Sequence, residues 1–580
     1  MKKILTYYLK PYYVRMVLGF VVKFIGTIMD LCLPWILAYM IDTVIPKGTR
    51  NEIFYWGLLM LLCSVLALLF NVIANRMASK VARDTTQMIR HDLFARVMQL
   101  SNAQTDGFTK PSLISRLTTD TYNVHQMLGR IQRLGVRAPI LVVGGILVTL
   151  TLDPVLTLVL ISVMPIITWI TVHVSKKSIP MYTALQESVD KFVRLIREDV
   201  AGIRVIKALS KTGFEKEKYD QINKEVVQRE KKAGVTMAIV NPAMNMFLNL
   251  GLVFVVIVGA YRVNSGACEV GKILAFLTYF TIILNAMMNI SKMFVIISKA
   301  VASADRIMEV IGAPEELLLE LCEKITENDI YVMFDHVTFS YNGRESDIED
   351  ISFSLKKGET LGILGATGAG KSTIAQLLMR FYDTDEGNIY IDGENIKSIE
   401  TSMLRKKFGV VLQNDSIFED TIAENIRLGR DISDVQVQEA ALYARAKEFV
   451  EENGRGYDSA INIRGANLSG GQKQRILIAR ALAAHPDILI LDDSSSALDY
   501  KTDAALRHEL SEHFSDTTKI VIAQRISSVM HSDHILVLDK GKCIGYGTHE
   551  ELLKNCALYS EISMSQIGKC ASEHVVNATS

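Results

Sequence analysis

The residues between positions 365 and 373 have the types and spacing of a phosphate-binding loop. They follow a short apolar strand, Leu361–Leu364, precede a helical stretch, Ile374–Arg380, and read Gly365-Ala366-Thr367-Gly368-Ala369-Gly370-Lys371-Ser372-Thr373. Glycine lets the backbone wrap around phosphate oxygens, and the amide groups and the N-terminal end of the next helix attract the anion. We expect Lys371 to reach the β- and γ-phosphates and Ser372 to hold Mg²⁺.

Two further motifs complete a set that is typical of sites that bind a nucleoside triphosphate. A second apolar strand, Ile488–Leu491, ends in Asp492, as expected for a carboxylate that organises the shell of Mg²⁺. Before it, a serine and two glycines stand near the start of a helical run, Ile476–Ala484, which again suits an anion. This third motif reads Leu468-Ser469-Gly470-Gly471-Gln472.

Composition separates the chain into an apolar and an ordinary soluble part. The 580 residues have a net charge of zero, so nothing favours nucleic acid as a partner, and we expect none. The seven cysteines are scattered, without the spacing of a disulfide framework or a zinc site. Almost all long apolar runs lie before about residue 300, which excludes a purely soluble ATPase.

The apolar part predicts six membrane spans, since a crossing helix needs about 20 mostly apolar residues. The connections after the second and fourth spans are long, charged and helix-periodic, with Lys and Arg close to the span ends. We therefore place these connections, both termini and the soluble part in the cytoplasm. The tips of the two long connections, Thr105–Lys110 and Leu209–Phe214, are expected to contact the soluble part. The spans cover about residues 14–45, 53–74, 138–152, 154–174, 234–260 and 271–298.

The predicted fold class is an all-α six-helix transmembrane domain with long cytoplasmic helical extensions, fused to an α/β P-loop nucleotide-binding domain. The transmembrane domain is expected over residues 1–310. The acidic, leucine-rich stretch within 311–330 is interpreted as a helical linker. Alternating strands and helices then predict the nucleotide-binding domain over 331–569. Residues 570–580 are expected to be a disordered tail.

In order, these motifs resemble those of the ATP-binding cassette family, specifically its exporter-type half-transporters. The resemblance covers nearly the whole chain. It implies that Tyr341 stacks on adenine, that Gln413 joins the Mg²⁺ and γ-phosphate site to the surface facing the membrane domain, and that Asp499 communicates between two opposed cassettes. Each of two ATP molecules would be held by the phosphate loop of one chain and the LSGGQ segment of the other.

The sequence departs from that family at catalytic positions. The residue after Asp492 is usually glutamate and here is Asp493, and a histidine that contacts the γ-phosphate is replaced by Gln524. The segment before LSGGQ also lacks a usual acidic residue. The chain thus resembles the impaired subunit of heterodimeric bacterial multidrug exporters of the plasma membrane. A competent, non-identical partner is implied, and a slowly hydrolysing homodimer is the alternative.

Polar residues inside the spans are candidates for contact with a transported substrate. Lys23 and Asp30 are seven residues apart on one helical face, and asparagines recur at helical spacing on the last two spans (Asn241, Asn245, Asn249, Asn285, Asn289). The same pattern also suits contacts between helices. The resemblance favours export of amphipathic compounds or drugs, while lipid translocation, peptide export and a regulatory role remain open. The fusion of membrane and ATP-binding parts argues against an importer.

Overall fold

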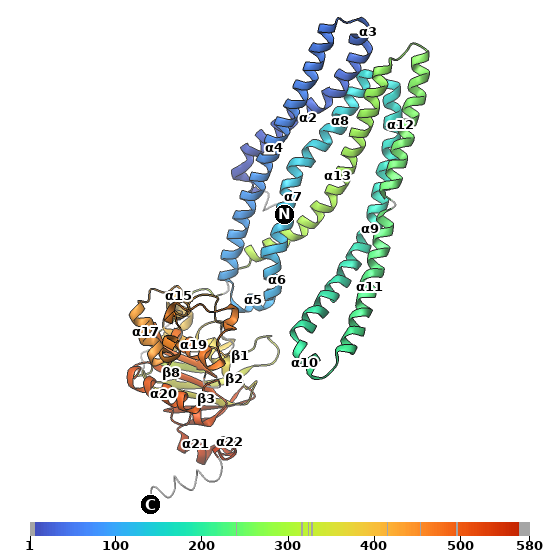
Figure 1. Ribbon diagram of the computed structural model, residues 1–580. Coiled ribbons are helices and arrows are strands. Elements are labelled where there is room, and N and C mark those ends of the chain that lie inside the picture. The colour runs from blue at the N-terminus through green and yellow to red at the C-terminus, as the bar shows by residue number, and fades with distance from the viewer. Residues whose placement is uncertain are drawn as a thin grey trace, which may run out of the picture. The chain divides into compact units, whose positions relative to one another are not determined.

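The computed structural model describes residues 6–238, 240–314, 317–322, 324–325, 329–413, 416–452, 454–494 and 497–567 (Figure 1). The predicted disordered tail, 570–580, lies outside these residues. The chain divides into two compact units, which are Met1–Gln99 with Thr109–Ala313 and Leu100–Phe108 with Pro314–Ser580. The short insert Leu100–Phe108 therefore belongs to the second unit although it lies among the first unit's helices in sequence.

The first unit consists of helices. Between them lie π-helical turns at Met40–Val44, Arg116–Asp120 and Ile131–Gly135. The α-helices are α2 (Tyr13–Tyr39), α3 (Ile45–Lys47), α4 (Arg50–Gln99), α6 (Lys110–Ser115), α7 (Thr121–Arg130), α8 (Val136–Leu152), α9 (Pro154–Ala201), α10 (Ile203–Ala208), α11 (Thr212–Ala238), α12 (Val240–Asn264) and α13 (Val270–Ile311).

Several of these helices are longer than a membrane is thick. Helix α4 has 50 residues and is therefore about 75 Å long, against about 30 Å for the hydrocarbon core of a bilayer. The predicted long helical extensions are thus confirmed. In the described residues, five helical stretches are long and apolar enough to cross a membrane, and α9 opens with a shorter apolar stretch, Pro154–Ile166. The sixth span stays a prediction.

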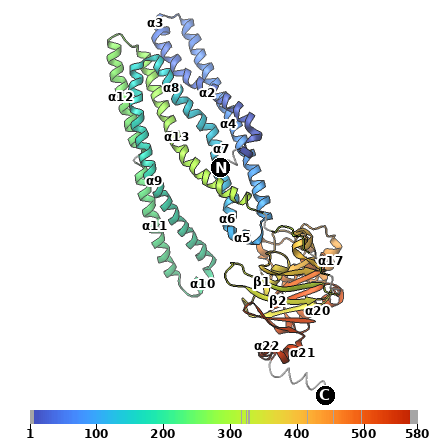
Figure 2. The same cartoon turned by 180° about the vertical axis from the view of Figure 1, so that it is seen from behind.

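Apolar contacts and ion pairs, among them Asp153 with Arg262, hold the helices of this unit together. Helix α9 lies beside α11 and α12, and α13 packs against α2, α7 and α8; both views show the first group side by side (Figures 1 and 2). The chain turns between α8 and α9 at Asp153, as predicted. The Asp153 carboxylate accepts hydrogen bonds from the amides of Val155 and Leu156, and Arg262 Nε donates to it at 2.9 Å.

The second unit contains two sheets. One is four-stranded, in the order β2-β1-β4-β5, and the other is six-stranded, in the order β10-β9-β3-β8-β7-β6. Strands β9, β3, β8, β7 and β6 run parallel. The strands are β1 (Val332–Phe339), β2 (Ile348–Leu355), β3 (Thr360–Gly365), β4 (Glu386–Ile391), β5 (Glu394–Asn395), β6 (Phe408–Val411), β7 (Ile488–Asp492), β8 (Thr518–Ala523), β9 (His534–Asp539) and β10 (Lys542–Gly547).

Helices complete the second unit, and the predicted α/β class is confirmed. They are α5 (Asn102–Phe108), α14 (Lys371–Leu378), α15 (Thr401–Lys406), α16 (Ile422–Arg427), α17 (Asp434–Tyr443), α18 (Lys447–Glu452), α19 (Gly470–Leu482), α20 (Tyr500–His513), α21 (His549–Asn555) and α22 (Ala557–Ile567). The expectation of a helical linker is wrong, because the described residues between Gly312 and Ile330 contain no helix. Backbone bonds to the cassette replace helical ones there, as Glu320 N donates to Lys397 O and Ile325 N to Gly393 O.

Replacing Asp153 separates its two roles. Asparagine can still cap the start of α9 but cannot pair with the charge of Arg262, whereas alanine does neither. We expect thermal unfolding of the purified protein to rank wild type above Asp153→Asn and Asp153→Asn above Asp153→Ala, with the lost cap costing about 1 kcal/mol. Equal melting temperatures for the three proteins would show that this turn does not stabilise the helical unit.

Candidate nucleotide-binding site

The predicted phosphate motifs meet at one edge of the six-stranded sheet. The loop of residues 365–373 follows β3, Gln524 follows β8, Asp492 ends β7 and Gln413 lies just beyond β6. These four strands are consecutive neighbours and run parallel. Because parallel strands end on the same side, residues up to 159 positions apart in sequence come together there, as ligand-binding residues of open α/β sheets do.

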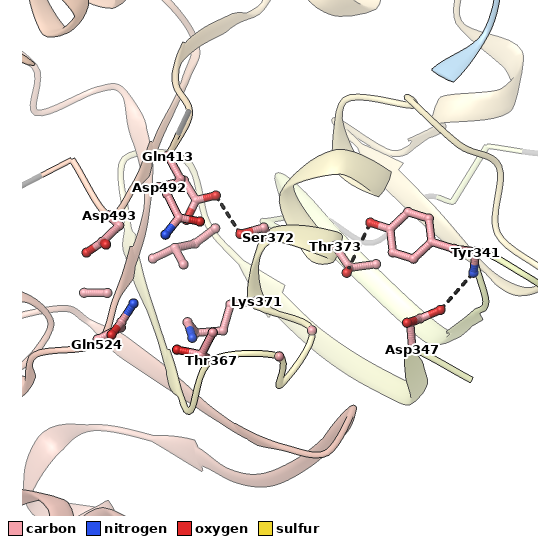
Figure 3. A pocket seen from close by; sticks show the side chains of 14 residues that line it. Tyr341, Asp347, Thr367, Lys371, Ser372, Thr373, Gln413, Asp492, Asp493 and Gln524 are labelled. Carbon is pink, nitrogen blue, oxygen red and sulfur yellow. Dashed lines mark hydrogen bonds between the residues drawn. The ribbon is translucent and has the colours of Figure 1, made fainter. Parts of the chain in front are cut away.

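A cavity of about 280 Å³ lies at this edge (Figure 3). Most of the predicted site residues line it, whereas Gly365, Ala366 and Ala369 form the loop without being among the lining residues. Asp347, Ile522 and Ala523 also line it and were not predicted. The lining residues are Tyr341, Asp347, Thr367, Gly368, Gly370, Lys371, Ser372, Thr373, Gln413, Asp492, Asp493, Ile522, Ala523 and Gln524.

The geometry of the loop requires glycine and holds Lys371 in place. Gly370 has φ +94°, and a Cβ there would lie 2.7 Å from the side chain of Ile348. Lys371 begins α14, and its ammonium donates to the carbonyl oxygens of Gly365 and Ala366 at 2.8 Å each. Burial lowers the pKa of Lys371, while Asp492 and Asp493 oppose that shift. The loop thus presents a cation and a helix N-terminus to one cavity, which is a site for polyphosphate.

Ser372 and Asp492 form the pair at which a metal ion would bind. Ser372 Oγ donates to the Asp492 carboxylate at 2.7 Å, and Asp492 is almost fully buried. Burial raises the pKa of this carboxyl, which the hydrogen bond from Ser372 counteracts. In the part of the chain that the structure describes, no group of three His, Cys, Asp or Glu side chains could hold a metal alone. Hydroxyl, carboxylate and amide oxygens beside a phosphate site nevertheless fit Mg²⁺, which keeps several waters and phosphate oxygens as ligands.

Asp493 and Gln524 lie together at the end of the cavity opposite Tyr341 (Figure 3). Asp493 has φ +50°, a left-handed backbone conformation that aspartate tolerates, and its amide donates to Ile522 O at 2.9 Å. Gln566 of α22 donates to Gln524 O at 3.0 Å and accepts from the amide of Ile526 at 2.8 Å. The backbone that carries Gln524 is therefore fixed from α22, a contact that no sequence pattern indicates.

Tyr341 closes the other end of the cavity. Its hydroxyl donates to Gln376 Oε1 at 2.9 Å and contacts Thr373 Oγ1 at 3.3 Å. Its ring packs edge-to-face on Tyr382, with centroids 5.1 Å apart. Tyr382 in turn donates to Asp106 of α5 at 2.6 Å. Helix α5, which overlaps the predicted contact tip Thr105–Lys110, thus reaches the ring that borders the cavity through one intervening tyrosine.

The LSGGQ segment lies elsewhere on the cassette. None of its residues, Leu468–Gln472, is among those lining the cavity. Ser469 caps α19, since its hydroxyl accepts from the amide of Gln472 and its own amide donates to Gln472 Oε1. Asp499 caps α20 by accepting from Thr502, and these hydrogen bonds lower the pKa of its carboxyl. The segment is an ordered helix start away from this chain's own phosphate loop.

The predicted polar membrane residues do not all lie at one site. Lys23 is buried and donates to Asn75 of α4 at 3.0 Å. Asp30 pairs with Arg137, which sequence reasoning missed. Asn285 and Asn289 line a small cavity with Arg137, while Asn249 borders a separate cleft between α12 and α13. Asn245 is exposed on α12, and the side chain of Asn241 lies outside the described residues.

The long apolar helices and the phosphate site together define a membrane protein with an ATP-binding cassette. Residues 16–287 match the family model of the ABC transporter transmembrane region, and residues 348–496 match that of the ABC transporter. The ABC transporter ATP-binding protein YfiB of Bacillus subtilis is 33% identical over 577 residues, which are 99% of this chain and 100% of that protein. The chain therefore belongs to the ABC transporter family.

Two further comparisons support the arrangement of its domains. The fatty acid ABC transporter ATP-binding/permease protein of Mycobacterium bovis is 31% identical over 84% of this chain and 77% of its own length. A bacterial Atm1-family ABC exporter, solved with ATP bound, superposes with a TM-score of 0.81 and 26% identity over 96% of this chain and 99% of that one. The protein is an integral multi-pass membrane protein and an ATP-driven exporter, one half of a dimeric transporter.

The role of Tyr341 can be tested by separating its ring from its hydroxyl. Tyr341→Phe keeps the ring and loses the bonds to Gln376 and Thr373, so we expect ATP affinity close to wild type. Tyr341→Ala removes the stacking surface, worth about 1–3 kcal/mol per base, and should weaken ATP binding by about tenfold or more. Binding of inorganic tripolyphosphate, which has no base, should be equal in all three proteins. Equal ATP affinity for Ala and Phe would refute adenine stacking.

Proposed function

We propose that this chain is the catalytically impaired half of a heterodimeric exporter. The supporting observation is the set of side chains that line a single cavity. It includes the residues expected to bind ATP, together with Asp493 and Gln524 at the positions usually held by the catalytic glutamate and histidine. In this proposal Lys371 contacts the β- and γ-phosphates and Tyr341 stacks on adenine. The Mg²⁺ site is formed by Ser372, Asp492 and Gln413. Mg²⁺, when bound, neutralises charge on the phosphate oxygens.

Asp493 is too short for the task of a glutamate at this position. One methylene fewer withdraws the carboxylate by about 1 Å, and a misplacement on that scale can cost about 10²-fold in rate, or about 2.7 kcal/mol of barrier. The left-handed backbone of Asp493 is tied to Ile522, which limits compensation by the main chain. Gln524 can donate a hydrogen bond to phosphate but cannot take up a proton at neutral pH. ATP is thus held and hydrolysed slowly.

The intact LSGGQ segment of this chain completes the ATP-binding site of the partner. Ser469 and the following glycines start α19 outside this chain's own cavity, which suits contact with an ATP molecule bound to the other cassette. ATP binding at both composite sites draws the cassettes together and turns the membrane cavity outward. Hydrolysis at the partner's competent site then resets the transporter. A homodimer with two slow sites is the competing account.

Amphipathic compounds are the proposed cargo. An apolar groove between α2 and α8 is lined by residues such as Phe24, Trp35 and Leu147, and Asp30 and Arg137 of the same two helices form an ion pair. An apolar surface and a charged pair on the same helices suit molecules with a polar group and an apolar body. The similar Mycobacterium bovis protein carries the name of a fatty acid transporter, so a lipid-like cargo is the second candidate. The bacterial plasma membrane is the proposed location.

Restoring the two usual residues should restore hydrolysis. We expect the double variant Asp493→Glu with Gln524→His to raise the ATPase rate of the purified chain by about 10²-fold, because it then carries complete sites on both halves of a dimer. Adding Lys371→Ala should abolish the gain. As a matched control, the same substitutions at two exposed positions outside the cavity, Asp516→Glu with Gln438→His, should leave the rate unchanged.

Two results would contradict the proposal. One is an ordinary ATPase rate in the wild-type chain alone that Asp493→Asn abolishes, which would establish a homodimer working through aspartate. The other is the absence of any gain in a double variant that dimerises on ATP, as judged by size-exclusion chromatography. In that case another feature of the cavity, and not these two side chains, would limit hydrolysis.

A further inference from the structure

A polar network with a net positive charge joins three membrane helices. On one side, Lys23 of α2 donates to the neutral Asn75 of α4 at 3.0 Å. One turn away on α4, Asn71 donates to Asp30 at 3.2 Å, and the same carboxylate oxygen accepts from Arg137 of α8 at 3.0 Å. The network thus contains two cations, Lys23 and Arg137, and one carboxylate, which pairs with Arg137. An uncompensated charge inside a membrane is expensive, so such groups mark binding sites and pathways.

Arg137 extends from this network into a cavity of about 230 Å³. Its guanidinium has five N–H donors, of which the described residues engage one, with Asp30 as the acceptor. Arg137 Nε is buried without a hydrogen-bond partner in the described structure, and 41% of the side chain remains exposed. The arginine therefore retains donors for another group.

The rest of the cavity wall combines amides with apolar side chains. Asn285 and Asn289 of α13 contribute donors, and the other lining residues are apolar, among them Leu141 and Ile282. A guanidinium fork beside amide donors binds carboxylate, sulfonate or phosphate groups with charge-assisted hydrogen bonds. The apolar wall suits the first carbons of an attached chain.

We propose that this cavity binds the anionic head group of a single-chain amphipathic compound. Arg137 is the residue that binds the charge, Asn285 and Asn289 orient the head group, and Asp30 with Asn71 positions the guanidinium. The inference deepens the proposed exporter function, and it rests on that function only in naming the ligand a transported substrate.

A binding measurement without nucleotide tests this proposal. The full chain is placed in nanodiscs of phosphatidylcholine, a zwitterionic lipid, and titrated with three 12-carbon probes below their micellar concentrations. Dodecanesulfonate is always anionic, dodecanesulfonamide is its neutral counterpart of similar size, and dodecyltrimethylammonium is cationic. We expect the sulfonate to bind about tenfold or more tightly than the sulfonamide, and the cation to bind more weakly than either.

Variants locate the binding. Asn285→Asp adds a carboxylate of nearly equal size to the cavity and should weaken sulfonate binding by about tenfold or more. The matched control is Asn249→Asp, which adds the same charge at an exposed position of α12 beside a different cleft. It should change the affinity by less than about twofold. Asn289→Asp provides a second variant in the same cavity, with the same expected loss, should Asn285→Asp fail to fold.

Several outcomes would overturn the proposal. They are equal affinities for sulfonate and sulfonamide, equal losses in Asn249→Asp and the cavity variants, and displacement of the sulfonate by phosphatidylglycerol, which would assign the cavity to a two-chain lipid. Because the assay needs neither ATP nor a partner, its failure would leave the impaired-site proposal untouched. Conversely, failure to restore hydrolysis would leave this cavity's selectivity unaffected.

Discussion

The nucleotide chemistry of this protein depends on four parallel strands that end at one edge of a buried sheet. Strand β7 is buried along its whole length, and β3 and β8 nearly so, because helices and loops cover both faces of such sheets. The polar side chains of the site therefore come from the carboxyl ends of the strands and the segments that follow them. Asp492 is the last residue of β7, whereas Lys371, Gln413 and Gln524 lie beyond the ends of β3, β6 and β8. The order of the strands brings these four residues to one cavity.

At this edge, the residues that bind ATP and those positioned for its hydrolysis come from different strands. Loop 365–373 and Tyr341 approach from β3 and from the segment before β2, whereas Asp493 and Gln524 come from β7 and β8. Substitutions at the second group leave the loop, its lysine and the Ser372–Asp492 pair in place. A cassette can therefore lose ATP hydrolysis without losing affinity for ATP. This is the physical basis for the proposal that the chain is the impaired half of a heterodimer.

Sequence patterns predicted what is local or periodic. The phosphate loop, the turn at Asp153 and the apolar helices each lie in one continuous segment, so spacing and hydrophobicity were enough to find them. A contact of the tip Thr105–Lys110 with the cassette was expected, but the individual residue pairs that join distant segments were not predicted. Asp106 and Tyr382 are 276 residues apart, Asp30 and Arg137 are 107 apart, and Gln566 reaches the loop after β8 from another helix. No pattern in one sequence reports such pairs.

The predictions that differ from the structure also have physical causes. The linker has the composition of a helix, but its backbone groups bond to Lys397 and Gly393 of the cassette instead of to each other. Lys23 and Asp30 share a helical face, as spacing predicted, yet the neighbouring α4 presents two asparagines one turn apart that engage them. Tertiary partners therefore decided how these segments fold and which charges remain available to a ligand.

The central claim, that this cassette binds ATP and hydrolyses it slowly, is tested most directly by identifying the nucleotide that the purified wild-type chain retains. The chain is incubated with Mg²⁺ and ATP labelled on both the base and the γ-phosphate, desalted rapidly, and the bound nucleotide is analysed at successive times. The account predicts intact ATP, with both labels in equal amount, long after mixing. Bound ADP with early loss of the γ-label would contradict it.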